Sequence, residues 1–331
     1  MKALRCLRHA GVDELAQVLE VQDVEDPTPG HDEVVVDVHV AGVNFTDLLF
    51  VSAGYQVPVP VPFTPGSEFS GVVAAIGPGV STVRPGDRVT GQVMSGAFAE
   101  QVVLAATAVR RVPDGVDLVT AAATGVAYGT AYSALRSAAV VRAAEWVAIT
   151  GAAGGVGSAA VVLARELGAH VLAVVSTPAK AAFCRRLRAD AVLDLSTTAD
   201  VKGEVRRLTD GGADVVLDLV GGGLAEPMLR GMRRGGRFVT LGYASGAIPR
   251  IPLNLLLLKE VTALGFEIRR FAEHHPSLAA RDAAELAALH ERGLMANVSA
   301  RYPLKQAPEA LRALADRSAV GKVVLTLTTA G

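Results

Sequence analysis

The stretch from Trp146 to Leu167, WVAITGAAGGVGSAAVVLAREL, constrains the fold of this chain more than any other. It opens with an apolar run, residues 146–149, that has the length and composition of a buried strand. A glycine-rich turn at 151–157 follows, and apolar residues then recur at helical spacing. Strand, glycine turn and helix in this order predict a dinucleotide-binding site.

The glycines of this turn give it a physical reason to bind a diphosphate. Main chain without side chains can approach the phosphates closely, and the new helix offers free N–H groups and a positive dipole end. The spacing matches the commonest fingerprint only loosely, with its core at 154–157. A strand–helix turn that binds no ligand remains the alternative.

The length of 331 residues suggests about two domains. Half of the residues are hydrophobic and 34 are glycine, which suits a compact α/β enzyme with many tight turns. The 32 basic and 33 acidic residues nearly cancel, and there is no basic run. This balance argues against nucleic acid as a partner.

Membrane and secretory segments are not expected. The longest apolar candidate, 248–258, contains two prolines and an asparagine, and the N-terminus lacks the apolar region of a secretory signal. Cys6 and Cys184 are too few for a disulfide framework and lie among apolar neighbours. We therefore expect a cytoplasmic protein with buried, reduced thiols and no membrane contact.

Two regions of different pattern indicate two kinds of domain. Up to about residue 113, short alternating segments between Gly/Pro turns predict a β-rich, barrel-like or curled sheet. From residue 146, strands alternate with helices, which predicts a parallel sheet with helices on both faces. The predicted strands are 2–7, 33–43, 71–76, 88–93, 98–104, 146–149, 170–175, 191–195, 214–219, 237–241, 261–266 and 322–328. The predicted helices are 118–138 (broken near Gly125 and Gly129), 156–167, 179–187, 201–209, 224–232, 278–292 and 308–317. The final strand has no helix after it, so it could return to the first domain.

The end of the second strand of the alternating region bears on which nicotinamide cofactor is bound. An acidic residue there would hold the ribose hydroxyls of NAD, but the segment 174–180, VVSTPAK, has none. Ser176 can donate a hydrogen bond, and Lys180 brings a positive charge one helical turn later. We therefore predict NADPH rather than NADH. In the alternative, Lys180 is an ordinary solvated side chain.

Several further motifs together resemble one known family over almost the full length of the chain. They are GVNFTD at 42–47, AGY at 53–55, PGSEFSG at 65–71, the segment 121–135 with its TAY at 130–132, the glycine turn, LGYASG at 241–246 and GKVVL at 321–325. The chain resembles the zinc-free quinone oxidoreductase branch of the medium-chain dehydrogenase/reductase superfamily, the zeta-crystallin-like enzymes.

The resemblance implies an α/β protein in which a Rossmann domain, 123–266, is inserted into a GroES-like catalytic domain, 1–122 and 267–331. The active site is then expected in the cleft between them. Zinc-dependent relatives hold a catalytic metal with cysteine and histidine, and the corresponding positions here are Asn44 and Ser67. The closely spaced cysteines of a structural zinc site are absent. We therefore expect no metal.

The resemblance also implies roles for single residues. Tyr55 is the candidate hydrogen-bond or proton donor to the substrate carbonyl, or else an aromatic shelf that packs the substrate. Asn44 lies near the nicotinamide or the substrate, unless it only forms a turn. Asp47 orients Asn44 or caps the following helix. The catalytic candidates are Tyr55 and Asn44, and the expected cofactor-binding residues are Asn44, Thr130, Ala153, Gly154, Gly155, Val156, Ser176, Lys180, Leu219, Val220, Gly242, Tyr243, Phe266 and Lys322.

Two positions depart from the relatives. Leu195 stands where they often carry a tyrosine beside the adenosine phosphate, which weakens the NADPH prediction without reversing it. Arg188 stands where they commonly end a helix with glycine, which could alter the adenine end of the site or add a phosphate contact.

The expected function is NADPH-dependent, zinc-independent reduction of quinones or other conjugated carbonyl compounds by hydride transfer. Without a Lewis acid, a conjugated acceptor is easier to reduce, because charge spreads onto a distant oxygen that one donor can satisfy. Two alternatives stay open: a medium-chain 2-enoyl-thioester (enoyl-CoA/ACP) reductase, and an NADPH-binding sensor or structural protein without turnover. The apolar segment 251–258 is either core or the surface of a homodimer, as the resemblance suggests.

Overall fold

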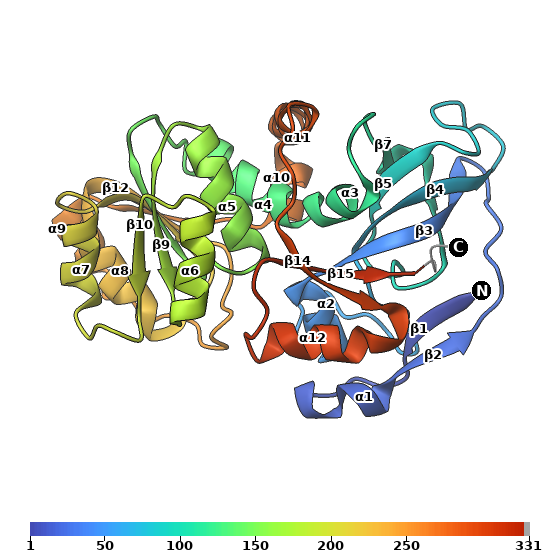
Figure 1. Ribbon diagram of the computed structural model, residues 1–331, viewed down its shortest axis with the longest axis horizontal. Helices are drawn as coiled ribbons and strands as arrows, with labels where there is room; N and C mark the ends of the chain where they lie inside the picture. The colour runs from blue at the N-terminus through green and yellow to red at the C-terminus, as the bar shows by residue number, and fades with distance from the viewer. Residues whose placement is uncertain (328–331) are drawn as a thin grey trace. The chain divides into compact units, whose positions relative to one another are not determined.

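A computed structural model describes residues 1–327 of the chain, which divide into two compact units. The first unit combines Met1–Ala127 with the segment that begins at Leu289, and the second unit is Tyr128–Ala288. The second unit is therefore inserted into the first. An α/β fold with a strand-rich first unit and a parallel sheet in the second is confirmed (Figure 1).

The first unit is built on a seven-stranded sheet in the order β14-β15-β3-β4-β5-β7, with β6 paired to β3. Its strands are β3 (Glu33–Val43), β4 (Glu68–Ile76), β5 (Arg88–Gln92), β6 (Gln101–Ala105), β7 (Val109–Arg111), β14 (Val298–Pro303) and β15 (Lys322–Thr326). A separate antiparallel pair consists of β1 (Lys2–Cys6) and β2 (Leu19–Asp23). The helices are α1 (Leu15–Val18), α2 (Phe45–Val51), α3 (Leu118–Thr124) and α12 (Ala307–Ala315).

The long strand β3 joins distant parts of the chain in this sheet. It pairs with β4, β6 and β15, and its buried valines lie in the core of the unit. Figure 1 shows β15, drawn in red, beside β3, drawn in blue, and Val323 lies opposite Val43 in their antiparallel register. The expected return of the last strand to the first domain is thus confirmed, although its expected end at residue 328 lies outside the described residues.

The second unit holds a six-stranded parallel sheet in the order β10-β9-β8-β11-β12-β13. Its strands are β8 (Trp146–Thr150), β9 (His170–Val175), β10 (Ala191–Asp194), β11 (Ala213–Asp218), β12 (Met232–Thr240) and β13 (Thr262–Gly265). Its helices are α4 (Ala127–Ser133), α5 (Gly155–Glu166), α6 (Pro178–Arg186), α7 (Val201–Leu208), α8 (Ala225–Gly231), α9 (Asn254–Lys259), α10 (Ile268–His274) and α11 (Pro276–Glu291). The strand order reverses between β8 and β11, and open sheets of this type bind ligands at the carboxyl ends of the strands at that point.

The second unit extends past the boundary expected at residue 266, because α11 is tied to the region of α4. The Tyr132 hydroxyl donates to Glu285 over 2.6 Å, and the Ser137 hydroxyl donates to Asp282 over 2.5 Å. Asp282 is buried, so this bond is shielded from water. These contacts keep the chain up to Ala288 with the second unit.

The helical region expected at 118–138, with breaks near Gly125 and Gly129, is divided into three pieces; the break near Gly125 is confirmed, whereas Gly129 lies inside α4. After α3, Gly125 ends the first helix, α4 follows, and a π-helical turn spans Ala134–Ala138. Among residues 1–327, none of the helices combines the length and the apolar character that a membrane crossing requires.

Candidate active site and cofactor site

The glycine turn after β8 allows a close approach between main-chain segments. Gly151 has φ +62°, in the left-handed region that favours glycine. A Cβ added at Gly157 would lie 2.2 Å from the Gly151 carbonyl oxygen, so only glycine fits between the start of α5 and the end of the turn. The helix can therefore begin directly against the strand.

The first turn of α5 presents main-chain donors to its surroundings. Gly154 precedes the helix in an extended conformation, and its carbonyl accepts the N–H of Ser158 over 2.8 Å. Among the described residues, no acceptor bonds the N–H groups of 155–157. These groups and the helix dipole fit a diphosphate, so the predicted residues 153–156 are suited to hold the nucleotide.

A buried carboxylate holds the neighbouring loop in place. Asp218, at the end of β11, is fully buried, and its Oδ1 accepts the Thr150 hydroxyl over 2.7 Å. The same oxygen accepts the N–H groups of Val220 (3.2 Å) and Gly221 (3.1 Å), and the Thr150 oxygen accepts the N–H of Leu219 over 2.9 Å. The ends of β8 and β11 are thereby fixed relative to each other.

The loops that follow β11 and β12 are joined in the same way. The N–H of Ala244 donates to the Leu219 carbonyl over 3.1 Å, and the N–H of Ser245 donates to the Val220 carbonyl over 2.9 Å. A Cβ added at Gly221 would lie 2.7 Å from the ring of Tyr243. The structure therefore brings the predicted residues Leu219 and Val220 together with the loop that carries Gly242 and Tyr243.

Ser176 and Lys180 lie together at the carboxyl end of β9. Ser176 is exposed, and Lys180 Nζ donates to its hydroxyl over 3.5 Å. The Thr177 side chain caps α6 by accepting the N–H of Lys180 over 3.3 Å. One hydroxyl and one ammonium thus face the same region, with no carboxylate at the strand end to repel a phosphate.

The other positions discussed for cofactor binding in the second unit lie in α4 and after β13, β10 and α6. Thr130 is half-buried in α4, and Phe266 is buried directly after β13, where its N–H donates to the Thr240 carbonyl over 3.0 Å. Leu195 is half-buried and packs against the apolar core of this unit. Arg188 is exposed and adopts φ +61°, the conformation for which glycine is more common.

The first unit holds a buried polar cluster around Asn44, at the start of α2. Lys322 Nζ lies 2.5 Å from Glu68 Oε1 and 2.5 Å from Asn44 Oδ1, and it also donates to the Val43 carbonyl over 3.1 Å. Asn44 Nδ2 donates to Glu68 Oε1 over 2.9 Å. Lys322 was expected to bind the cofactor, but its ammonium is buried and has three partners inside this unit. That Lys322 binds the cofactor stays a prediction.

Asp47, in the first turn of α2, completes this cluster. Its Oδ2 accepts the main-chain N–H of Asn44 over 2.8 Å, so it both orients Asn44 and caps the helix. Its Oδ1 is buried without a hydrogen-bond partner among the described residues. Burial raises the pKa of the Asp47 carboxyl to about 7, although the N–H of Asn44, the hydroxyl of Ser67 and the ammonium of Lys322 act in the opposite direction.

Tyr55 lies just after α2, in the same unit as Asn44. Its ring is half-buried and packs on Phe50, with ring centroids 4.6 Å apart and an interplanar angle of 59°. This packing fixes the ring and suits either predicted role, a hydroxyl donor or an aromatic shelf. Asn44, Tyr55 and Lys322 thus belong to the first unit, and the other predicted residues belong to the second.

The donor set at Asn44 does not fit a catalytic zinc. The two positions that would carry metal ligands are an amide and a hydroxyl, and an ammonium already contacts the Asn44 oxygen. Zinc sites in proteins use thiolate, imidazole and carboxylate ligands. Within the described part of the chain, no three histidine, cysteine, aspartate or glutamate side chains are arranged to hold a metal ion. That the chain uses no metal stays a prediction.

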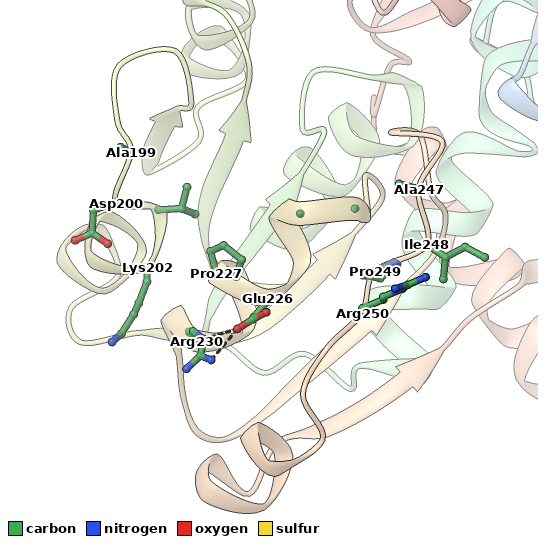
Figure 2. Close-up of a pocket in the computed structure, with 13 residues that line it drawn as sticks. Ala199, Asp200, Lys202, Glu226, Pro227, Arg230, Ala247, Ile248, Pro249 and Arg250 are labelled. Carbon is green, nitrogen blue, oxygen red and sulfur yellow. Dashed lines mark hydrogen bonds and ion pairs between the residues drawn. The ribbon is translucent and has the colours of Figure 1, made fainter.

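A hollow of about 550 Å³ opens elsewhere in the second unit, at the starts of α7 and α8. Figure 2 shows Glu226 and Arg230 facing each other in an ion pair at 2.7 Å, with Lys202 and Arg250 among the lining side chains. Its lining contains none of the predicted cofactor residues. The candidate site is therefore defined by the strand-end loops and not by this hollow.

Two residues that matter here carry no role in the sequence prediction. Glu68 stands in the PGSEFSG motif, so the sequence pointed to this position. Its partner Lys322 is 254 positions away, so no local pattern indicated their contact. Asp218 ends an otherwise apolar strand, and a carboxylate in that position could have indicated a buried hydrogen-bond acceptor.

Comparison with known proteins agrees with this architecture. Residues 30–114 match the family described as alcohol dehydrogenase GroES-like domain, and residues 155–285 match the family described as zinc-binding dehydrogenase. Quinone oxidoreductase-like protein 2 of Mus musculus is 36% identical over 326 residues, which is 98% of this chain and 93% of the relative.

Solved structures with the same fold include three informative ones. The quinone oxidoreductase of Pseudomonas syringae pv. Tomato DC3000 has a TM-score of 0.89 and 32% identity, covering 98% of this chain and 99% of that one. The Escherichia coli quinone oxidoreductase complexed with NADPH has a TM-score of 0.89 and 27% identity, covering 99% and 100%. The CurK enoyl reductase has a TM-score of 0.86 and 26% identity, covering 99% of each chain.

A GroES-like unit with an inserted parallel sheet that carries a glycine turn defines an oxidoreductase of the medium-chain dehydrogenase/reductase type. Within that class, the chain belongs to the quinone oxidoreductase family.

Proposed function

We propose that the chain is an NADPH-dependent, zinc-independent reductase of quinones or other conjugated carbonyl compounds. The observation that carries this proposal is the glycine-rich first turn of α5 after β8, together with the Ser176–Lys180 pair at the end of the neighbouring strand β9. The turn suits a diphosphate, and the pair suits the additional phosphate that distinguishes NADPH from NADH. The similarity to the Escherichia coli quinone oxidoreductase, whose structure is a complex with NADPH, supports the same cofactor.

Bound nicotinamide supplies the hydride in this chemistry. The chain's own contribution is to hold the nucleotide on the loops fixed by Asp218 and to provide a hydrogen-bond donor for the acceptor oxygen. Tyr55 is the proposed donor, because its ring is fixed against Phe50 and a phenol can donate a hydrogen bond or a proton to a carbonyl oxygen. Asn44 is proposed to contact the nicotinamide end of the nucleotide.

The second candidate function is reduction of a 2-enoyl thioester. It is favoured by the similarity to the CurK enoyl reductase over nearly the whole of both chains. Both acceptors are conjugated carbonyl compounds, so the same cluster and the same Tyr55 would serve either. The rate of turnover with each acceptor distinguishes the two candidate functions.

The test is oxidation of NADPH by the purified chain with a simple benzoquinone and, separately, with an enoyl-CoA. We expect faster turnover with the quinone. Faster turnover with the enoyl-CoA would favour the second candidate. Tight binding of NADPH without oxidation by either acceptor would favour a sensor or structural protein instead.

We also propose that the chain acts as a homodimer in the cytoplasm. Among the described strands, the outer strand β13 pairs only with β12, and Leu253, Leu257 and Leu258, which precede it in the chain, are between 66% and 79% exposed. An exposed apolar patch next to a free strand edge suits a second copy of the chain. Cys6 and Cys184 are buried free thiols, which suits a reducing compartment.

The mass of the chain in solution tests the dimer. We expect a dimer for the wild type and a monomer for a variant with Leu257→Glu and Leu258→Glu. Leu7→Glu places the same charge on an exposed apolar residue of the first unit and serves as the control. A monomeric wild type contradicts this part of the proposal.

A further inference from the structure

A proline-rich segment without charge follows Tyr55 in the first unit. At positions 48–67 the chain carries no charged side chain, although 20% of all its residues are charged. Within this stretch, residues 56–62 read QVPVPVP, and we call them the strap. Because the strap directly follows the proposed hydrogen-bond donor, it offers an uncharged surface close to the expected place of the acceptor.

The strap is tied to the first unit at both of its ends. Before it, the ring of Tyr55 packs on the ring of Phe50, with centroids 4.6 Å apart. After it, the main chains of Phe63 and Cys6 exchange two hydrogen bonds, of 2.7 and 3.2 Å. The strap therefore has a fixed start and a fixed end against this unit.

The prolines make the strap stiff and give it two different faces. Each proline fixes its own φ and confines the residue before it to extended conformations. Side chains alternate in an extended chain, and here the prolines at 58, 60 and 62 are exposed, whereas Val57 and Val59 are half-buried. Val59 and Tyr55 both pack against the apolar core of the first unit. A ligand that contacts the valine face thus meets a surface that needs little further ordering.

The chemistry of this surface determines what can lie on it. The valine face offers methyl groups, and the guanidinium of Arg5 at the end of the strap is already bonded to the Pro62 carbonyl (3.1 Å) and the Thr64 hydroxyl (3.3 Å). A phosphate or carboxylate would lose hydration here without gaining a cation of the strap. An alkyl group, in contrast, is transferred favourably from water to such a surface.

We propose that the valine face of the strap binds the apolar substituent of the acceptor, so that the chain prefers quinones with an alkyl chain over unsubstituted or charged ones. Val57 and Val59 are then specificity-determining residues that act on the acceptor and not on the nucleotide. This inference rests on the proposed function, since it takes Tyr55 as the group that meets the acceptor oxygen.

A series of 2-alkyl-1,4-benzoquinones, from methyl to pentyl, tests the wild type. The ring that accepts the hydride is the same in each compound, so the alkyl chain is the variable. We expect kcat/KM to rise about twofold for each added CH2 group, as for methylenes that are partly removed from water. A kcat/KM that does not rise with chain length would overturn the inference. If no quinone of the series oxidises NADPH, the proposed function itself is refuted instead.

Variants of Val57 test whether the strap causes this dependence. Val57→Asp is expected to lower kcat/KM for the pentyl quinone at least about fivefold more than for the methyl quinone, whereas Val57→Leu should keep the rise with chain length. Val57→Thr preserves the shape of the side chain and should show the same difference at about twofold. The Kd for NADPH, from fluorescence titration, is expected to stay within about twofold in all three.

Val103→Asp is the matched control, because it places the same charge on an exposed apolar residue of β6 in the first unit. It should leave the dependence on chain length as in the wild type. An equal loss for all quinones in Val57→Asp and Val57→Thr, or the same selective loss in Val103→Asp, contradicts the inference.

Substrates of the 2-enoyl-CoA type with increasing acyl length separate the quinone from the second candidate function. Their acyl chain is apolar as well, but coenzyme A also carries phosphates. We expect a kcat/KM below that of the pentyl quinone at every acyl length. A rise with acyl length together with a flat quinone series would overturn the inference, because the strap would then bind an acyl chain and not the substituent of a quinone.

Discussion

The ammonium of Lys322 lies 2.5 Å from the side-chain oxygen of Asn44, although 278 positions separate the two residues in the sequence. Lys322 is the first residue of β15, and Asn44 directly follows β3. The antiparallel pairing of these two strands brings them together. The end of the chain thus completes a polar cluster whose other members come from the first 70 residues.

The close packing at Gly157 predicts a large effect of one added methyl group. Gly157→Ala is expected to lower the free energy of unfolding by about 3 kcal/mol, because the new Cβ meets the Gly151 carbonyl oxygen. The displaced turn should also weaken NADPH binding. Gly129→Ala is the control, since a Cβ there meets no atom within 4 Å inside a helix and should raise stability by up to about 1 kcal/mol. Urea unfolding of both variants measures the difference, and equal effects contradict the account.

Removing the Lys180 ammonium should alter cofactor preference. Lys180→Ala is expected to weaken NADPH binding about tenfold and to leave NADH binding unchanged, because only NADPH carries the additional phosphate. Titrations with both nucleotides check this. Lys202→Ala, which removes an exposed ammonium from the start of α7, should change neither. An equal loss for both nucleotides would mean that Lys180 does not contact that phosphate.

Asp218 is predicted to stabilise the loops after β8 and β11. Asp218→Ala leaves the Thr150 hydroxyl and two main-chain N–H groups without their acceptor, so we expect a loss of about 3 kcal/mol in the free energy of unfolding and weaker NADPH binding. Asp218→Asn keeps one oxygen acceptor and should cost about 1 kcal/mol. Chemical unfolding and a fluorescence titration measure the two effects. Equal losses in the free energy of unfolding for Asp218→Ala and Asp218→Asn would show that the carboxylate does not hold the loops.

The buried carboxyl of Asp47 predicts a pH dependence of stability. Its pKa in the folded chain is raised from 3.8 to about 7, so the folded chain favours the neutral acid. The stability that this preference contributes is fully present below pH 3.8 and is lost as the pH rises toward 7. Measured relative to Asp47→Asn, which does not titrate, the wild type should lose about 2–3 kcal/mol between about pH 5 and about pH 8. A difference that does not change with pH would show that Asp47 is already ionised at the lower pH.

Local patterns predicted most of the fold. The strand, turn and helix of 146–167 could be recognised from apolar spacing and glycine alone, and the structure has β8 and α5 there. The alternation of strands and helices after residue 146 likewise led to the parallel sheet. These features depend on contacts between residues that are close in sequence, and the spacing of apolar residues indicates such contacts.

The parts that could not be predicted depend on pairs of residues far apart in the chain. Lys322 was predicted only as a cofactor-binding residue, and its burial beside Glu68 depends on the register of β15 against β3. The extent of the second unit beyond residue 266 depends similarly on side chains of α11 that bond to Tyr132 and Ser137. The tie of Thr150 to Asp218 joins two strand ends that are 68 positions apart.

Fluorescence titration of the purified wild-type chain with NADPH and with NADH, followed by mixing of the NADPH complex with a benzoquinone, tests the central claim most directly. We predict a Kd for NADPH at least about tenfold below that for NADH, and oxidation of the bound NADPH by the quinone without added metal. Equal or absent binding of the two nucleotides, or bound NADPH that the quinone does not oxidise, would contradict it.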